Sequence, residues 1–151
     1  NCPKGFRRKR SKMKIVVDAN ILFAALIRSS ITETILLSSQ LQLMAPQYLL
    51  EEFAKHKKEL LGITSRNEKD FDKMLEVFER RISLVPENEL KKHLQHAREL
   101  LEDKNDADYL AACLALNAPL WSNDNGFRKQ KTVKVYTTKE LIEYLKIERP
   151  I

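Results

Sequence analysis

Residues 14–20 read KIVVDAN, and this short stretch decides the fold. The run KIVV is apolar and rich in β-branched side chains, which is typical of a buried strand. Asp18 follows it directly, and a helical pattern of apolar residues begins at Ala19. A strand that leads at once into a helix is the first half of a unit in which the next strand runs parallel. The stretch therefore predicts a parallel sheet with Asp18 at the carboxyl end of one strand.

Three further apolar segments predict strands: residues 41–45 (LQLMA), 119–122 (PLWS) and 133–137 (VKVYT). Helical patterns separate them, and Pro46 in the first turn and Gly62 after the end mark one of these helices. We therefore expect a three-layer α/β fold, with a central parallel sheet of four to five strands flanked by helices. The expected helices span residues 19–27, 32–40, 46–61, 67–78, 87–101 and a central, buried 106–116, with a last one around 141–145.

The composition predicts a globular protein that folds as a single domain over residues 13–151. Hydrophobic residues make up 43% and charged residues 32% of the 151 positions, which excludes a disordered chain. No apolar run approaches the roughly 20 residues of a membrane-spanning helix, and no secretory signal is found. The two cysteines, Cys2 and Cys113, form no CxxC pair and fit a reducing compartment. We expect a cytoplasmic protein without a membrane partner.

The net charge of +6 is concentrated at one end of the chain. Residues 1–12 contain six Lys or Arg and no acid, which leaves 21 basic and 21 acidic residues in 13–151. We expect this segment to be a disordered tail, either an arm that contacts RNA or an extension placed before a natural start at Met13. The second interpretation is favoured, so the charge is not an argument for function.

Four carboxylates occupy positions where a parallel sheet forms its sites, outside the carboxyl ends of the strands. Asp18 and Asp124 each follow a predicted strand, Asp106 begins a predicted helix, and Glu52 lies in the second turn of another. Carboxylates gathered at one point repel each other unless cations compensate them, and oxygen ligands select Mg²⁺ or Mn²⁺. Such ions activate water for displacement at phosphorus, so the pattern points to phosphodiester hydrolysis.

Each of these acids also has an ordinary structural role open to it. Asp18 and Asp106 are plausible helix N-caps, and Asp124 stands in the turn sequence NDNG. Glu52, next to another glutamate, has the position of a solvated helix residue. Singly, none of them indicates a site; their order and their placement at strand ends together do.

The segments VVDANIL, LLEEF, NDADYLAACLAL and LWSNDNGF resemble the successive motifs of PIN-domain nucleases, in the family's order and over essentially all of 13–151. The resemblance implies that Asp18, Glu52, Asp106 and Asp124 are the catalytic acids and that Asp18, Asp106 and Asp124 hold the metal. Two placements have a neighbour as an alternative: Glu51 for Glu52, and Asp108 for Asp106. By the same resemblance polar side chains support the cluster, namely Asn20, Asp108 and Ser122.

The resemblance further implies Mg²⁺- or Mn²⁺-dependent cleavage of single-stranded RNA, leaving 5′-phosphate and 3′-hydroxyl ends. Many small microbial members are toxins of toxin–antitoxin pairs, which implies an antitoxin partner and a homodimer. The basic residues Arg128 and Lys129, shortly after Asp124, are candidates for RNA binding, although an exposed loop explains them equally well.

Two other classes of function stay open: a catalytically silent PIN-like module that only binds, and a DNA-directed nuclease. The presence of all four acids favours an active ribonuclease over the silent module. Only two glycines, Gly62 and Gly126, occur in residues 13–151, so phosphate-binding loops of the Walker A or GxGxxG type are excluded. A metal site of Glu89, His93 and His96 is conceivable, but a solvated helix face explains that segment better.

Overall fold

The computed structural model describes residues 12–27, 30–64 and 66–146, without the side chains of Ser30, Glu52 and Asn105. The basic segment that was expected to form a disordered tail lies outside these residues, apart from Lys12.

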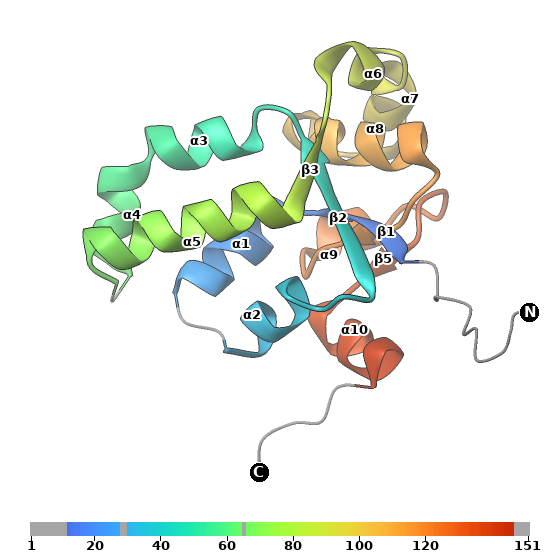
Figure 1. Cartoon of the computed structure of the whole chain (residues 1–151). Coiled ribbons are helices and arrows are strands. Elements are labelled where there is room, and N and C mark those ends of the chain that lie inside the picture. Colours follow the sequence, from blue (N-terminus) through green and yellow to red (C-terminus); the bar gives the residue numbers. More distant parts are fainter. Residues whose placement is uncertain (1–11, 28–29, 65, 147–151) are drawn as a thin grey trace, which may run out of the picture.

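A five-stranded sheet forms the centre of the molecule (Figure 1). Its strands are β1 (Met13–Val17), β2 (Leu41–Pro46), β3 (Ile82–Val85), β4 (Leu120–Trp121) and β5 (Val135–Tyr136). They lie in the order β3-β2-β1-β4-β5, and every neighbouring pair is parallel. The predicted α/β fold with a parallel sheet of four to five strands is therefore confirmed.

The strand order reverses between β1 and β4. From β1 the chain moves outward through β2 to β3, and then returns across the sheet to place β4 on the other side of β1. Val17 of β1 is paired with Trp121 of β4, so the two strands end side by side. In open α/β sheets a crevice forms at such a reversal, outside the carboxyl ends of the strands. The residues directly after β1 and β4 therefore line that crevice.

Helices cover both faces of the sheet. Helices α6, α7 and α8 lie on one side, and α1, α2 and α10 lie on the other (Figure 1).

No helix in the described part of the chain is long and apolar enough to cross a membrane. The helices are α1 (Ala19–Leu26), α2 (Ser30–Leu36), α3 (Leu49–Lys55), α4 (Lys57–Ile63), α5 (Glu68–Arg81), α6 (Glu87–Lys91), α7 (Leu94–Leu100), the 3₁₀ turn η1 (Lys104–Asp106), α8 (Ala107–Leu116), α9 (Asn125–Arg128) and α10 (Thr138–Leu145).

Helix α8 is the central buried helix that the sequence predicts. It packs against β1, β2 and β4 on one side and against α6 and α7 on the other. Its small residues Ala107, Ala111 and Ala112 are buried, which lets the helix lie close to the sheet. The helix ends at Asn117 in the left-handed region (φ 52°), where asparagine is well tolerated. This packing fixes the start of the helix, and with it Asp106, beside the crevice.

Aromatic side chains fill the space between the sheet and its flanking helices. The Phe53 ring contacts Phe23 at a centroid distance of 4.8 Å and Phe78 at 5.9 Å. Trp121 is fully buried, and its indole N–H donates a 3.0 Å hydrogen bond to Oγ1 of Thr138. Its burial in the core leaves no surface for stacking on a nucleobase. The carboxyl end of β4 is thereby held rigidly in the core.

Strand β3 is absent from the strands that the sequence predicts. The segment ISLV follows α5 with no turn residue between them, and four residues are too few to show a strand period. Ile82 and Val85 are buried, whereas Ser83 and Leu84 are exposed. Its pairing with β2 identifies it as a strand, and that pairing is invisible in the local sequence.

Three predicted helices differ from those observed. The helix predicted over residues 32–40 is α2, which ends at Leu36. Pro46 is the last residue of β2 instead of the first turn of a helix, and the helix begins at Leu49. The predicted helix 46–61 is divided into α3 and α4, and Gly62 lies inside α4 rather than after its end. The predicted helix 87–101 is likewise divided into α6 and α7. The apolar period continues across both breaks, so it does not show where the backbone hydrogen bonds are interrupted.

Candidate active site

Asp18 and Ser122 meet at the crevice, each at the carboxyl end of its strand. The Ser122 hydroxyl donates a hydrogen bond of 2.7 Å to Oδ2 of Asp18. The same hydroxyl oxygen accepts the backbone N–H of Asp124 at 3.0 Å. Asp18 is 4% exposed and Ser122 is fully buried. One serine therefore joins the ends of β1 and β4 and fixes the position of both predicted acids.

The carboxyl group of Asp18 is held in an environment that disfavours its charge. Burial raises the pKa of Asp18, and the negative charge of Asp124 adds to the rise. The hydrogen bond from Ser122 and the backbone N–H groups of Asn20 and Ala19 offset this in part. The three donors stabilise the ionised form of this buried carboxyl group. Its negative charge still needs a positive charge nearby to offset the cost of burial.

Asp124 begins helix α9. Its Oδ1 accepts a 2.8 Å hydrogen bond from the backbone N–H of Gly126, while the side chain itself is exposed. A Cβ atom at position 126 would lie 3.2 Å from Oδ1 of Asp124, which is tighter than ordinary contacts. The glycine in the sequence NDNG thus leaves room for the carboxylate, in addition to favouring the turn.

Asp106 is the last residue of η1 and stands directly before α8 without capping it. Burial raises the pKa of Asp106 to about 6, and the charges of Asp103, Asp18 and Asp124 contribute to the rise. Three of the predicted acids are thus close enough to repel one another. Asp103 was not predicted; its spacing of three residues from Asp106 is the signal that points to it.

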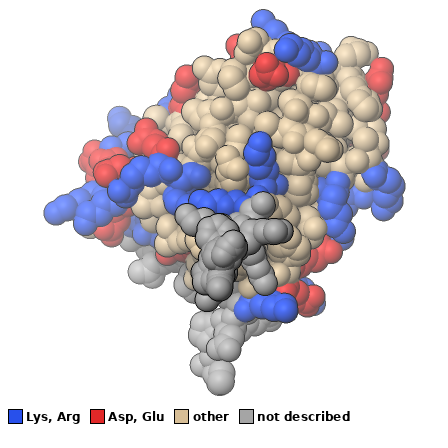
Figure 2. Space-filling view, turned by 45° about the vertical axis from the view of Figure 1, so that its right-hand side comes forward, with Lys and Arg blue, Asp and Glu red and all other residues tan. Residues whose placement is uncertain are grey.

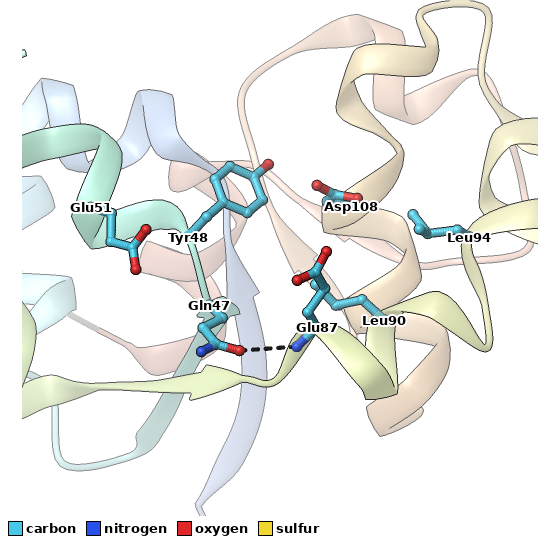
Figure 3. A pocket seen from close by; sticks show the side chains of 7 residues that line it. All are labelled: Gln47, Tyr48, Glu51, Glu87, Leu90, Leu94 and Asp108. Atoms are coloured by element: carbon cyan, nitrogen blue, oxygen red, sulfur yellow. Dashed lines mark hydrogen bonds between the residues drawn. The ribbon is translucent and has the colours of Figure 1, made fainter. Parts of the chain in front are cut away.

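The remaining predicted acids are placed differently. Glu52 lies in α3, but its side chain is outside the described part of the chain. Its alternative Glu51 lines a second cavity of about 350 Å³, and Asp108 lines the same cavity. In Figure 3 the Tyr48 ring stands between Glu51 on one side and Asp108 and Glu87 on the other. Neither Glu51 nor Asp108 lines the cleft that contains Asp18.

That cleft has a volume of about 340 Å³, and of the predicted acids Asp18 and Asp106 line it. Tyr109 is 6% exposed in its wall, and its hydroxyl is hydrogen-bonded to Tyr48 and to the backbone N–H of Ala19. Burial, followed by the neighbouring Tyr48 and Asp18, holds the pKa of Tyr109 well above its usual value. The tyrosines and His56 were not predicted as part of the site. The cleft is lined by Asp18, Ala19, Asn20, Phe23, Tyr48, Leu49, Phe53, His56, Asp106 and Tyr109.

The two basic residues that the sequence singles out lie at and just after the end of α9. Arg128 is paired with Glu140 at 3.1 Å, and Lys129 with Glu102 at 2.9 Å. The pKa of Lys129 is raised by Glu102, with a small contribution from Asp124. On the face shown in Figure 2, basic and acidic side chains are interspersed around a broad uncharged area. Each of the two basic side chains near Asp124 is therefore already paired with a carboxylate.

The acids fit a hard divalent cation. They offer only oxygen donors, and their mutual repulsion is the kind that a cation relieves. Among the described side chains, no group of three or more Asp, Glu, His or Cys is already gathered around one metal position. That finding concerns the present orientation of the side chains. Asp124 is exposed and Asp106 half-buried, whereas Asp18 is almost fully buried.

Comparison with known proteins gives a family and a similar fold. A family model described as PIN domain matches residues 16–146. The crystal structure of VapBC2 from Rickettsia felis, bound to a DNA fragment from their promoter, contains a chain with a TM-score of 0.65 and 16% identity. The match covers 83% of the present chain and 98% of that chain, and at this identity it shows the fold alone. No curated protein sequence matches the chain.

Proposed function

This chain belongs to the PIN-domain family, and on that premise we propose that it is a metal-dependent endoribonuclease that hydrolyses phosphodiester bonds of single-stranded RNA. The observation that carries the proposal is the buried Asp18 at the strand reversal, with the charges of Asp106 and Asp124 acting on the same centre. A carboxylate that is costly to bury and repelled by its neighbours serves no packing purpose. It is explained by a cationic ligand.

Asp18, Asp106 and Asp124 would hold the metal, with Glu52 as the fourth catalytic acid. Bound Mg²⁺ or Mn²⁺ supplies Lewis-acid chemistry: it activates water and stabilises a leaving oxygen at phosphorus. In the proposed reaction water adds to phosphorus and the bond to the 3′ oxygen breaks, which leaves 5′-phosphate and 3′-hydroxyl ends.

The surrounding residues orient these acids. The Ser122 hydroxyl holds Oδ2 of Asp18, and the backbone N–H groups of Asn20 and Ala19 hold the same carboxyl group, so its orientation towards a cation is fixed. Asn20 lines the cleft beside Asp18 and can contact a ligand with its amide. Arg128 and Lys129 are proposed to exchange their carboxylate partners for phosphates of the bound strand.

A cleavage assay tests the proposal. End-labelled single-stranded RNA and DNA of the same sequence are incubated with the protein and Mg²⁺, Mn²⁺ or EDTA. We expect cleavage of the RNA with either metal and none with EDTA. Asp18→Asn and Asp106→Asn should each lower the rate at least about 100-fold, because losing a metal ligand removes several kcal/mol of transition-state stabilisation. Glu76→Gln, an exposed acid on α5, is the matched control and should keep full activity.

The possible outcomes separate the alternatives. Activity that survives EDTA and both Asp substitutions contradicts the metal mechanism. Preferential cleavage of DNA indicates a DNA-directed nuclease, and inactivity on both strands combined with tight binding of either indicates a silent binding module.

We further propose that the chain acts in the cytoplasm as the toxin of a toxin–antitoxin pair, and that it forms a homodimer. The motif resemblance supports the first statement, as does the shared fold with a chain of VapBC2. Expression in a bacterial host should arrest growth for the wild type and not for Asp18→Asn. Light scattering after size exclusion should give twice the mass of one chain.

A further inference from the structure

The cleft beside the acids has aromatic walls that the reaction chemistry itself does not require. Phe23 and Phe53 are in contact at 4.8 Å on one side, and Tyr48 and Tyr109 complete the lining with them. We propose that this cleft binds one unpaired nucleobase of the substrate strand, next to the phosphate that is cut, and that His56 at its edge contacts that base. The proposal rests on the proposed nuclease function.

The size and composition of the cleft suit a planar ring. Its volume of about 340 Å³ is at the small end of the range for ligand pockets, which runs from about 300 to 1,000 Å³. Phe23 and Tyr48 are half-buried, so each keeps part of its ring available to a ligand. Stacking on aromatic side chains is the usual way in which proteins hold the bases of single strands.

The position of the cleft excludes other parts of a nucleic acid as its occupant. Asp18 and Asp106 line the same cleft as the aromatic side chains, so a phosphate bound through a cation at these acids is the neighbour of any group that fills the rest. Ribose and phosphate are polar and would lose their hydration against Phe23, Phe53 and Leu49. The base is the only part of a nucleotide with an apolar face, and it is one sugar away from the phosphate.

His56 supplies the polar contact. Its side chain is 43% exposed, and the residue both lines the cleft and immediately precedes α4. Its Nδ1 lies 3.4 Å from Oε1 of Glu59, a contact that orients the ring at the edge of the cleft. The ring nitrogen that does not face Glu59 can form a hydrogen bond with a group on the edge of a base.

A base bound in this cleft is no longer stacked on its neighbours in the strand. The cleft therefore favours single strands over duplexes. A paired base would first have to be unpaired and turned out, at a cost of a few kcal/mol that a single strand does not incur. The cleft accounts for selection of single strands over duplexes. It does not by itself distinguish RNA from DNA, since that depends on the 2′-hydroxyl.

The test removes the base and keeps the phosphates. After the cleaved bond in a single-stranded RNA oligonucleotide has been mapped with Mn²⁺, the same strand is made with an abasic ribose on either side of that bond. We expect one of the two abasic strands to be cleaved about tenfold less efficiently, mainly through a higher KM, because one stacking contact is lost. His56→Ala should lower cleavage of the intact strand about fivefold and of that abasic strand much less. His96→Ala, an exposed histidine on α7, is the control.

Equal cleavage of both abasic strands and the intact strand overturns the proposal, even where the nuclease function holds. A His56→Ala effect of the same size on intact and abasic strands also overturns it, because His56 would then act on something other than the base. If the wild type cuts no nucleic acid, the nuclease function fails separately. Fluorescence anisotropy of a labelled single strand and of a fully abasic strand of the same length then decides, and equal affinity for the two excludes the base site.

Discussion

The Ser122 hydroxyl donates a 2.7 Å hydrogen bond to Oδ2 of Asp18 inside the protein, where neither residue is more than 4% exposed. It is the direct side-chain link between the ends of β1 and β4, and it also receives the backbone N–H of Asp124. The geometry of the acidic centre depends on this one oxygen atom. Its removal should therefore affect stability and chemistry together.

Ser122→Ala is expected to lower the free energy of unfolding by about 1–3 kcal/mol, since it leaves a buried carboxyl group short of a donor. The Ser122 hydrogen bond lowers the pKa of Asp18, so its loss raises that pKa further. Asp18 will then ionise only at higher pH, and the acid limb of the pH–rate profile should move upward. Urea unfolding and rates between pH 5 and 9 measure both effects. Ser83→Ala, an exposed serine of β3, should change neither.

Asp106→Asn should stabilise the metal-free protein at neutral pH. The pKa of Asp106 is about 6 in the folded protein, against an ordinary value of 3.8, so the folded chain holds the extra proton between these values. Stability from this group is present below pH 4 and is lost as the pH rises to 6. Asparagine carries no charge and avoids that loss. The free energy of unfolding of Asp106→Asn should therefore be about 1 kcal/mol higher than that of the wild type at pH 7.5, after allowance for partial solvent screening.

Thermal melts in EDTA at pH 4 and pH 7.5 measure this effect. A gain of that size corresponds to a rise of about 2–4 °C in Tm at pH 7.5. Addition of Mg²⁺ should raise Tm for the wild type and less for the variant, because a ligand that binds the folded state stabilises it. A variant that is destabilised equally at both pH values would show that Asp106 has an ordinary capping role.

Gly126→Ala should reduce activity without reducing stability. Its Cβ would press on Oδ1 of Asp124 at 3.2 Å and displace that carboxylate, which we expect to cost about tenfold in rate. Alanine in a helix is otherwise up to about 1 kcal/mol more favourable than glycine. Gly62→Ala is the matched control, since nothing lies within 4 Å of its Cβ in α4. Loss of activity in both variants, or in neither, would contradict this account of Gly126.

Lys129→Ala should weaken RNA binding in a manner that depends on salt. If Lys129 exchanges Glu102 for a phosphate of the RNA, the alanine variant loses one phosphate contact. The magnitude of the slope of log affinity against log salt should then fall by about 0.7 for a single strand. Anisotropy titrations of a labelled single-stranded RNA at several KCl concentrations measure that slope. Lys73→Ala, an exposed lysine on α5, should leave it unchanged. An unchanged slope for Lys129→Ala would assign this residue to its ion pair alone.

The parts of the fold that could be predicted from the sequence are those in which a local pattern coincides with burial. Strand β1 with Asp18 at its end, and α8 with its run of small apolar residues, are of this kind. Strand β3 is different, because only its pairing with β2 makes it a strand. The break between α3 and α4 is hidden in the same way, since the apolar period runs through it.

The candidate site shows the same division. Asp18, Asp106 and Asp124 could be proposed because each stands at a strand end or a helix start, where the topology brings them together. The cleft could not be proposed, because Tyr48, His56 and Tyr109 come from separate segments that only the folded chain brings to one cavity. No spacing within the chain predicts that contact.

The hydrogen bond between Ser122 and Asp18 joins positions 104 residues apart, so it can form only late in the synthesis of the chain. A ribosome adds about 5–20 residues per second, so Asp18 is made on the order of ten seconds before its partner. During that interval the growing chain has β1, β2 and β3 but lacks the strand that completes the acidic centre. The acidic centre can therefore form only after most of the chain has been translated.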